Sequence, residues 1–274
     1  MSDKSTIAIL GAGNLGSAIA HGLVDAGIYE AGNILVTNRR RDLLKPLKHY
    51  GFAVRYDNTD AVKETDVMII SVEPQQINGL LQEIKSTLDP ARHIIISVVT
   101  GVSIKEILAQ LDSPVTVIRA MPNTAIAIRQ SMTCIASENG DENALEIATK
   151  IFNTVGETLV IKEEDMIAAT ALGACGIAFF LRAIRAASQG GIEIGFHADV
   201  ALKIAAQTAK GAASLVLSEG KHPEHEIDKV TTPRGVTISG LNQMEHEGFS
   251  SAMIKGIVTS AEKASRLYAG KNND

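Results

Sequence analysis

A glycine-rich turn near the amino terminus is the first place where residue types and spacing indicate chemistry. It follows a short apolar run at 6–10, opens a helical pattern at 17–26, and consists of Gly11, Ala12, Gly13, Asn14, Leu15 and Gly16. Between a strand and a helix, such glycines make a tight turn, let the backbone approach a pyrophosphate, and let the helix pack on the strand. Free amides at the helix N-terminus then favour phosphate. We therefore predict a dinucleotide site; the alternative is a glycine-rich turn that binds nothing.

Basic side chains stand where the second strand of that unit should end. An acidic residue about 20 residues beyond the glycines would hold a ribose 2′-hydroxyl, but the chain reads Thr37, Asn38, Arg39, Arg40 and Arg41. Guanidinium groups suit a 2′-phosphate, which needs paired donors and positive charge. The sequence therefore favours NADPH over NADH, with a solvated basic helix start as the alternative.

Two later loops point to the same edge of the predicted sheet. Ser71 to Gln75 follows one apolar run, and Val98 to Val102 follows the next. Because ligands of open α/β sheets bind at the carboxyl ends of the strands, we expect both loops to flank the ribose and nicotinamide. Pro74 is also expected to open a helix.

A threonine-rich segment in the second half could bind a small carboxylate. Residues 228–241 gather four Thr or Ser hydroxyls and two Gly around Pro233. Between two helices, this composition predicts a turn into a helix N-terminus, where amides and hydroxyls can hold an anion. A capped turn without a ligand fits the segment equally well.

Metal and disulfide chemistry are not indicated. His222 and His225 lie three positions apart but lack a third ligand, so a surface helix start is favoured over zinc. Cys134 and Cys175 stand far apart, which argues against a disulfide scaffold or a thiolate metal site. We expect no metal.

The elements that must position these groups fall into two patterns. Apolar runs at 6–10, 34–36, 67–70, 94–97 and 115–118 alternate with helical patterns, and pieces at 132–136 and 157–161 flank a helix that Asp141 could cap. Runs that are apolar at every position indicate strands covered on both faces. The second half predicts helices at 163–173, 176–194, 198–219, 223–230, 235–247 and 249–269. The predicted fold is α/β: a Rossmann-type doubly wound parallel sheet at 1–163, followed by an all-helical domain at 164–274.

Composition limits the partners. The chain has 274 residues, is 45% hydrophobic, and carries 26 basic and 31 acidic side chains for a net charge of −5. An acidic balance gives no general attraction to nucleic acid or to an anionic membrane. The first residues do not resemble a signal peptide, and Arg182 and Arg185 interrupt the longest apolar run. We expect a cytoplasmic protein with no membrane segment.

Several motifs together resemble a known family. The glycine turn, the Val72-Glu73-Pro74-Gln75 loop, the 119–124 segment Arg-Ala-Met-Pro-Asn-Thr, residues 205–208, His222-Pro223 and residues 230–241 match pyrroline-5-carboxylate reductase in order and spacing, over almost the whole chain. The resemblance implies reduction of the cyclic imine 1-pyrroline-5-carboxylate to L-proline by NAD(P)H, the last step of proline biosynthesis. It also implies helical domains that interlock into dimers, often building decamers, with each active site completed by a neighbouring subunit.

The same resemblance implies roles for particular residues. The cofactor would be bound by Gly11, Ala12, Gly13, Asn14, Leu15, Gly16, Asn38, Arg39, Arg40, Asn58, Val72, Glu73, Pro74 and Gly101. Val236 and Thr237 would hold the substrate carboxylate and ring nitrogen. We further hypothesise that Thr237 is the catalytic hydrogen-bonding group at the nitrogen, while amides from Gly235 to Thr237 bind the carboxylate.

The chain also departs from the family pattern at three places. Glu73 stands where the family usually has Lys, residues 173–178 replace Ser-Gly-Ser-Gly-Pro-Ala, and Arg234 and Val236 replace Gly and Thr. Two other functions therefore stay open. One is another imine or β-hydroxyacid reductase on the same plan, with Lys162 near the domain junction. The other is a regulatory protein that binds NADP without turnover.

Overall fold

The computed structural model describes residues 6–138 and 141–266, and it divides by contacts into two units. One unit contains the chain up to Cys175 together with the segment from Ser260; the other is Gly176–Thr259. The predicted domain limits at residues 1 and 274 lie outside the described residues.

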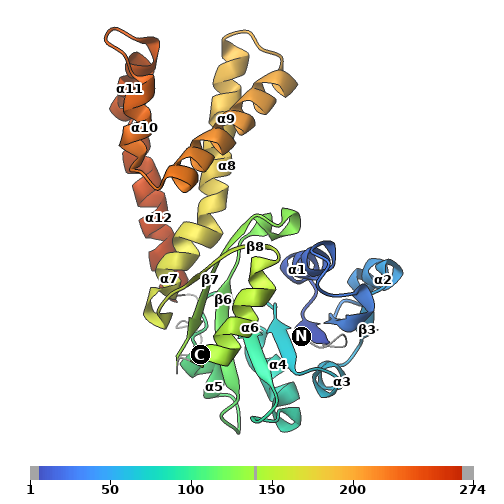
Figure 1. Ribbon diagram of the computed structural model, residues 1–274. Coiled ribbons are helices and arrows are strands. Elements are labelled where there is room, and N and C mark those ends of the chain that lie inside the picture. Colours follow the sequence, from blue (N-terminus) through green and yellow to red (C-terminus); the bar gives the residue numbers. More distant parts are fainter. Residues whose placement is uncertain (1–5, 139–140, 267–274) are drawn as a thin grey trace. The chain divides into compact units, whose positions relative to one another are not determined.

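The first unit is built on an eight-stranded sheet with the order β3-β2-β1-β4-β5-β6-β7-β8 (Figure 1). The strands are β1 (Ile7–Leu10), β2 (Ile34–Thr37), β3 (Ala53–Arg55), β4 (Val67–Ile70), β5 (Ile94–Ser97), β6 (Thr116–Met121), β7 (Ser131–Ser137) and β8 (Gly156–Val160). The first six strands are mutually parallel, whereas β7 is antiparallel to β6 and parallel to β8. The predicted doubly wound sheet is confirmed, and it is mostly rather than wholly parallel.

Helices cover both faces of this sheet, which explains its apolar strands. They are α1 (Asn14–Asp25), α2 (Arg41–Tyr50), α3 (Asn58–Lys63), α4 (Ile77–Ile84), α5 (Ile104–Leu108) and α6 (Glu142–Asn153). Ile7 and Ile9 pack in a core cluster with residues of α1, α2 and α6, while Ala8 and Leu10 pack with residues of α3, α4 and α5. Successive strand side chains point to opposite faces, so a strand covered on both sides needs an apolar residue at every position.

Short turns of helix and one irregular segment connect these elements. The 3₁₀ turns are Ala31–Asn33, Lys85–Thr87, Thr124–Ile128 and Glu163–Asp165. The last of these leads into α7 (Met166–Ala169) and then a π-helical segment, Thr170–Cys175. The prediction of a single helix at 163–173 is therefore wrong, because the segment passes through 3₁₀, α and π geometry in succession.

Two further local expectations are resolved by hydrogen bonds. Asp141 caps α6 as expected, because its side chain accepts a bond from the amide of Ala144 at 3.0 Å. Pro74 does not open a helix: it lies in a turn where the amide of Gln76 donates to the carbonyl of Glu73, and α4 begins only at Ile77.

The second unit is helical, as expected. Its elements are α8 (Gly176–Glu193), α9 (Ala198–Glu219), α10 (Pro223–Val230), α11 (Val236–His246) and α12 (Phe249–Arg266), the last of which continues beyond Thr259. Residues 267–269 of the last predicted helix lie outside the described range.

Large apolar side chains are exposed along these helices. Leu202 is 52% exposed, Phe180 60%, Ile254 61% and Leu217 85%. By length and composition alone, Glu163–Glu193 and Ala198–Ser218 could cross a membrane, so composition does not support the expectation that no such segment exists. An apolar surface of this extent normally faces a partner or a bilayer.

Candidate active site

The glycine turn has the geometry that dinucleotide binding requires. Gly11 adopts φ +100°, and a Cβ there would lie 2.5 Å from the carbonyl oxygen of Ser71. A Cβ on Gly16 would come within 2.5 Å of the carbonyl oxygen of Gly11, whereas one on Gly13 would meet nothing within 4 Å. The first and third glycines are thus fixed by close packing, and the second leaves space beside the backbone. This space is what the approach of a pyrophosphate needs.

The helix after the turn begins with amides of the kind that phosphate binding would use. Gly13 is the N-cap of α1 without a capping side chain, so the amides of the first turn, from Asn14 and Leu15 to Gly16, have no side-chain acceptor from the cap. Ala12 is buried and Asn14 is exposed. The amides of Gly11 and Ala12 donate to the carbonyl of Thr37 at 3.2 and 2.7 Å, which joins the turn to the end of β2.

The basic side chains follow the end of β2, where the sequence predicts them to lie. The side chain of Asn38 accepts a bond from the amide of Arg40 at 2.8 Å, and Arg39 is exposed. Arg40 donates to Asp42 at 2.9 Å. This hydrogen bond raises the pKa of Arg40 and lowers that of Asp42, so both groups stay charged. Because both side chains are exposed, their attraction is weak.

Asn58, the first residue of α3, is also placed at this corner. Its side-chain oxygen accepts a 2.6 Å hydrogen bond from the hydroxyl of Thr37, and its amide nitrogen donates to Glu83 at 2.9 Å. The assigned role of Asn58 in cofactor binding stays a prediction, but its side chain is fixed beside the end of β2.

The loops after β4 and β5 leave the same edge of the sheet. Val72 packs against the position where a Cβ of Gly11 would stand, and Glu73 is exposed. Gly101 adopts φ +79° in the other loop, which ends in a capping box where Ser103 and Glu106 exchange hydrogen bonds. Gly101 is thereby held just before a rigid helix start.

Asn123 makes side-chain hydrogen bonds that the sequence alone did not indicate. The side chain of Asn123 accepts a bond from the amide of Ala125 at 3.0 Å and donates to the carbonyl of Gly173 at 3.2 Å. That carbonyl belongs to the π-helical segment, whose wider turns often occur at functional sites. The Met-Pro-Asn-Thr motif thus fastens the segment that leads to the second unit.

In the second unit, the threonine-rich segment forms a turn before α11, as predicted. The amide of Gly235 donates to the carbonyl of Thr232 at 2.9 Å, and Arg234 adopts φ +60°. Gly235 is the N-cap of α11 without a capping side chain, so the first amides of the helix are open to an anion. Thr237 is exposed, and Val236 is 91% exposed.

His222, one of the two histidines before this turn, caps a helix. His222 is the N-cap of α10, and its Nδ1 accepts a hydrogen bond from the amide of Glu224 at 3.3 Å. This agrees with the predicted surface helix start. Among the described residues, no group of three or more His, Cys, Asp or Glu side chains has metal-binding geometry.

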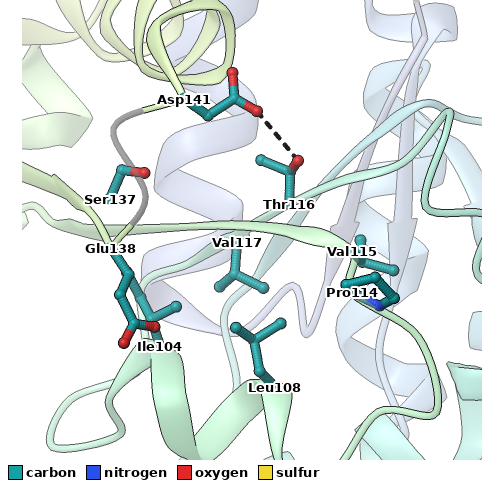
Figure 2. A pocket seen from close by; sticks show the side chains of 9 residues that line it. All are labelled: Ile104, Leu108, Pro114, Val115, Thr116, Val117, Ser137, Glu138 and Asp141. Carbon is teal, nitrogen blue, oxygen red and sulfur yellow. Dashed lines mark hydrogen bonds between the residues drawn. The ribbon is translucent and has the colours of Figure 1, made fainter.

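A surface hollow of about 110 Å³ lies away from the glycine turn. It is lined by Ile104, Leu108, Pro114, Val115, Thr116, Val117, Ser137, Glu138 and Asp141, and Figure 2 shows the 3.2 Å bond from Thr116 to Asp141. Because Thr116 begins β6, the hollow is at the amino ends of the strands. A dinucleotide binds at the carboxyl ends, so this hollow is not the candidate site.

Comparison with protein families agrees with both units. Residues 6–101 match the model described as NADP oxidoreductase coenzyme F420-dependent, and residues 163–267 match the model for pyrroline-5-carboxylate reductase dimerisation. The second match covers the helices whose large apolar side chains are exposed, and its description names dimerisation.

Individual relatives extend the likeness over the whole chain. Pyrroline-5-carboxylate reductase 1 of Dictyostelium discoideum is 54% identical over 98% of this chain, but the chain spans about half (51%) of that protein. Pyrroline-5-carboxylate reductase 2 of the same organism is 49% identical, over 99% of this chain and 96% of the relative.

Solved structures share the fold. The Plasmodium falciparum pyrroline carboxylate reductase, solved with NADP bound, has a TM-score of 0.89 at 23% identity, covering 97% of this chain and 99% of that one. The enzyme from Coxiella burnetii has a TM-score of 0.87 at 27% identity, over 97% and 99% of the two chains. Since the likeness to the second Dictyostelium reductase spans nearly all of both chains and agrees with the glycine turn and the helical half, this chain belongs to the pyrroline-5-carboxylate reductase family of nicotinamide-dependent oxidoreductases.

Proposed function

We propose that this chain reduces 1-pyrroline-5-carboxylate to L-proline and prefers NADPH as the reductant. The observation that carries the proposal is the 49% identity to a pyrroline-5-carboxylate reductase over 96% of that protein. The geometry of Gly11, Gly13 and Gly16 supports the nucleotide half, because the middle glycine leaves open space where a pyrophosphate would approach.

The preference for NADPH rests on the end of β2. Thr37 and Asn38 stand where an acidic residue would hold a ribose 2′-hydroxyl, and Arg39 and Arg40 follow in exposed positions. The nearby carboxylate of Asp42 is already bound by Arg40. Paired guanidinium donors at this place favour a 2′-phosphate over a free hydroxyl.

The chemistry asks the chain mainly to position the substrate. When bound, the dinucleotide supplies a hydride to the imine carbon, while the ring nitrogen takes a proton. We assign the substrate carboxylate to the first amides of α11, those of Val236 and Thr237, where the helix dipole favours an anion, because the amide of Gly235 already donates to the carbonyl of Thr232. The hydroxyl of Thr237 hydrogen-bonds the ring nitrogen and aligns the imine for hydride transfer.

Self-association completes the proposal. The dimerisation family match and the exposed apolar side chains of α8 and α9 support a dimer, and we propose that dimers assemble further into a decamer. In such an assembly the threonine-rich turn serves the nucleotide of a neighbouring copy. We place the protein in the cytoplasm, where the sequence predicts it.

A single assay tests the reaction and the cofactor together. Purified protein is given 1-pyrroline-5-carboxylate with NADPH or NADH, and oxidation of the nicotinamide is followed by its absorbance. We expect turnover with both and a higher kcat/KM with NADPH. Turnover only with imines of other ring size or with β-hydroxyacids would contradict the substrate assignment, and binding without turnover would indicate a sensor instead. Lys162 does not favour a β-hydroxyacid reductase, because its side chain is 79% exposed and lies 3.5 Å from Glu164.

A further inference from the structure

We propose that Arg41 and Tyr56 form the stacking platform for the adenine base of the cofactor. This inference deepens the proposed function, on which it rests for the presence of a dinucleotide. Neither residue is among those that the family resemblance assigns to the cofactor.

The two side chains form a cation–π pair on the surface. Arg41 is the first residue of α2, and its guanidinium carbon lies 5.0 Å from the centroid of the Tyr56 ring, which follows β3 directly. The distance is within the range of about 6 Å where such pairs attract. Tyr56 is nevertheless 61% exposed. The guanidinium therefore holds a large ring in one orientation while leaving much of its surface open to a planar ligand.

This pair stands where the adenosine end of a dinucleotide should lie. Strands β2 and β3 are parallel, with Thr37 opposite Arg55, so Asn38 and Tyr56 follow neighbouring strand ends. The amides of the glycine turn bind the carbonyl of Thr37, which places the turn at the same corner. In this fold the ribose next to the adenine is held at the end of the second strand.

Two of the other arginines at this corner bind carboxylates. Arg55 binds Glu64 through two hydrogen bonds of 2.7 and 2.6 Å, and Arg40 binds Asp42. Arg39 is exposed and forms no ion pair within the described residues. This distribution separates two tasks. Arg39 is available to a 2′-phosphate, and Arg40 would bind it by giving up its exposed pair with Asp42, whereas Arg41, which lies over an aromatic ring, is oriented to stack on a base.

Binding of cofactor fragments tests this division. Calorimetric titrations with 2′,5′-ADP and with 5′-AMP are made on the full-length protein and on its Tyr56→Ala, Tyr56→Phe, Arg41→Ala and Arg39→Ala variants. Base stacking on an aromatic side chain is sensitive to loss of the ring but not of its hydroxyl. We expect Tyr56→Ala to weaken both nucleotides by about tenfold and Tyr56→Phe to bind within about twofold of the wild type.

The two arginine variants distinguish base stacking from a merely structural role. Arg41→Ala should weaken both nucleotides by the same factor, since stacking does not involve the 2′-phosphate, whereas Arg39→Ala should weaken only 2′,5′-ADP. Tyr50→Ala is the matched control. Tyr50 is 46% exposed and ends the same helix, which begins at the carboxyl edge of the sheet and runs away from it. Its removal should leave both affinities unchanged.

The outcomes separate this inference from the proposed function. If Tyr56→Ala binds both nucleotides like the wild type, or if the loss in Arg41→Ala is confined to 2′,5′-ADP, the platform is wrong while the reductase activity stands. If the wild type binds neither fragment and does not oxidise NADPH with 1-pyrroline-5-carboxylate, both fail. Thermal unfolding of each variant shows that any lost affinity belongs to folded protein.

Discussion

Arg119, which is buried, forms an ion pair with the partly buried Glu163, with Nη1 of the arginine 2.8 Å from Oε1 of the carboxylate. Their side chains are 5% and 22% exposed. The same carboxylate oxygen accepts a 3.1 Å hydrogen bond from the amide of Ile104, the first residue of α5. One carboxylate thus ties together β6, the helix after the Gly101 loop, and the 3₁₀ turn Glu163–Asp165.

Removing one partner of this pair should cost much more stability than removing both. Arg119→Met leaves a carboxylate partly buried beside an apolar side chain, and such a loss typically costs about 3 to 5 kcal/mol. Arg119→Met combined with Glu163→Leu leaves no unpaired charge and should recover a large part of that loss. Urea unfolding of the wild type, the two single variants and the double variant measures the coupling. Additive losses would mean that the two side chains contribute independently.

Little of this ion pair could be read from the sequence, because its members are 44 positions apart and belong to different elements. The glycine turn was predictable because Gly11, Gly13 and Gly16 act within one strand-turn-helix unit. The ends of α9 and α10 were also predictable, since local caps and periodicity determine them. Tertiary contacts decide the rest.

Two elements of the sheet show where local pattern fails. Strand β3 was missed because it has only three residues, all partly buried, at the edge of the sheet. The reversal at β7 depends on the connection from β6, which holds only a 3₁₀ turn and no crossover helix; a parallel partner would need a longer crossover. The π-helical segment meets Asn123 through the bond to Gly173, which lies 50 positions away.

Thr237 should contribute to catalysis through its hydroxyl. If that hydroxyl hydrogen-bonds the ring nitrogen, Thr237→Ala should lower kcat/KM for 1-pyrroline-5-carboxylate by about 30-fold, equivalent to about 2 kcal/mol. Thr237→Ser keeps the donor and should stay within about threefold of the wild type. Ser239→Ala removes a neighbouring hydroxyl on α11 as a control and should have little effect. An unchanged kcat/KM in Thr237→Ala would remove this residue from the mechanism.

Arg234 occupies a backbone position that suits glycine. With φ +60° at the third residue of the Thr232–Gly235 turn, it adopts a conformation that costs a non-glycine residue about 1 kcal/mol or more. Arg234→Gly should therefore raise the thermal midpoint, whereas Arg234→Ala, which keeps a Cβ, should not. If the guanidinium also binds the substrate carboxylate, both variants should raise KM for the imine equally. An equal rise in thermal midpoint for Gly and Ala would contradict the strain argument.

The apolar surface of α9 should hold copies of the chain together. Leu202 is 52% exposed in the described chain, and a charge introduced at an interface core is costly because it loses water without gaining a partner. Leu202→Arg should shift the protein toward monomers in sedimentation velocity at micromolar concentration. Lys105→Glu, which changes an exposed charge on α5, serves as the control and should sediment like the wild type. Unchanged sedimentation of Leu202→Arg would place the interface elsewhere.

His93 should make the folded state sensitive to acid. Its ring is 2% exposed, and Nδ1 accepts a hydrogen bond from the amide of Asp89 at 2.8 Å, so the neutral ring carries its proton on the buried Nε2. Burial, helped by the nearby charge of Arg92, lowers the pKa of His93, while Asp66 and Asp89 partly oppose the shift.

The direction of that shift determines the pH dependence. The unfolded histidine has a pKa of about 6.5, so the unfolded chain binds the proton more readily than the folded one. The stability that His93 contributes is therefore fully present above about pH 6.5 and is lost as the pH falls through the lower folded pKa. Urea unfolding between about pH 5 and 8 should show that the wild type loses stability toward acid more steeply than His93→Phe, which cannot titrate. Parallel pH profiles for the two proteins would mean that protonation of His93 is not what weakens the fold.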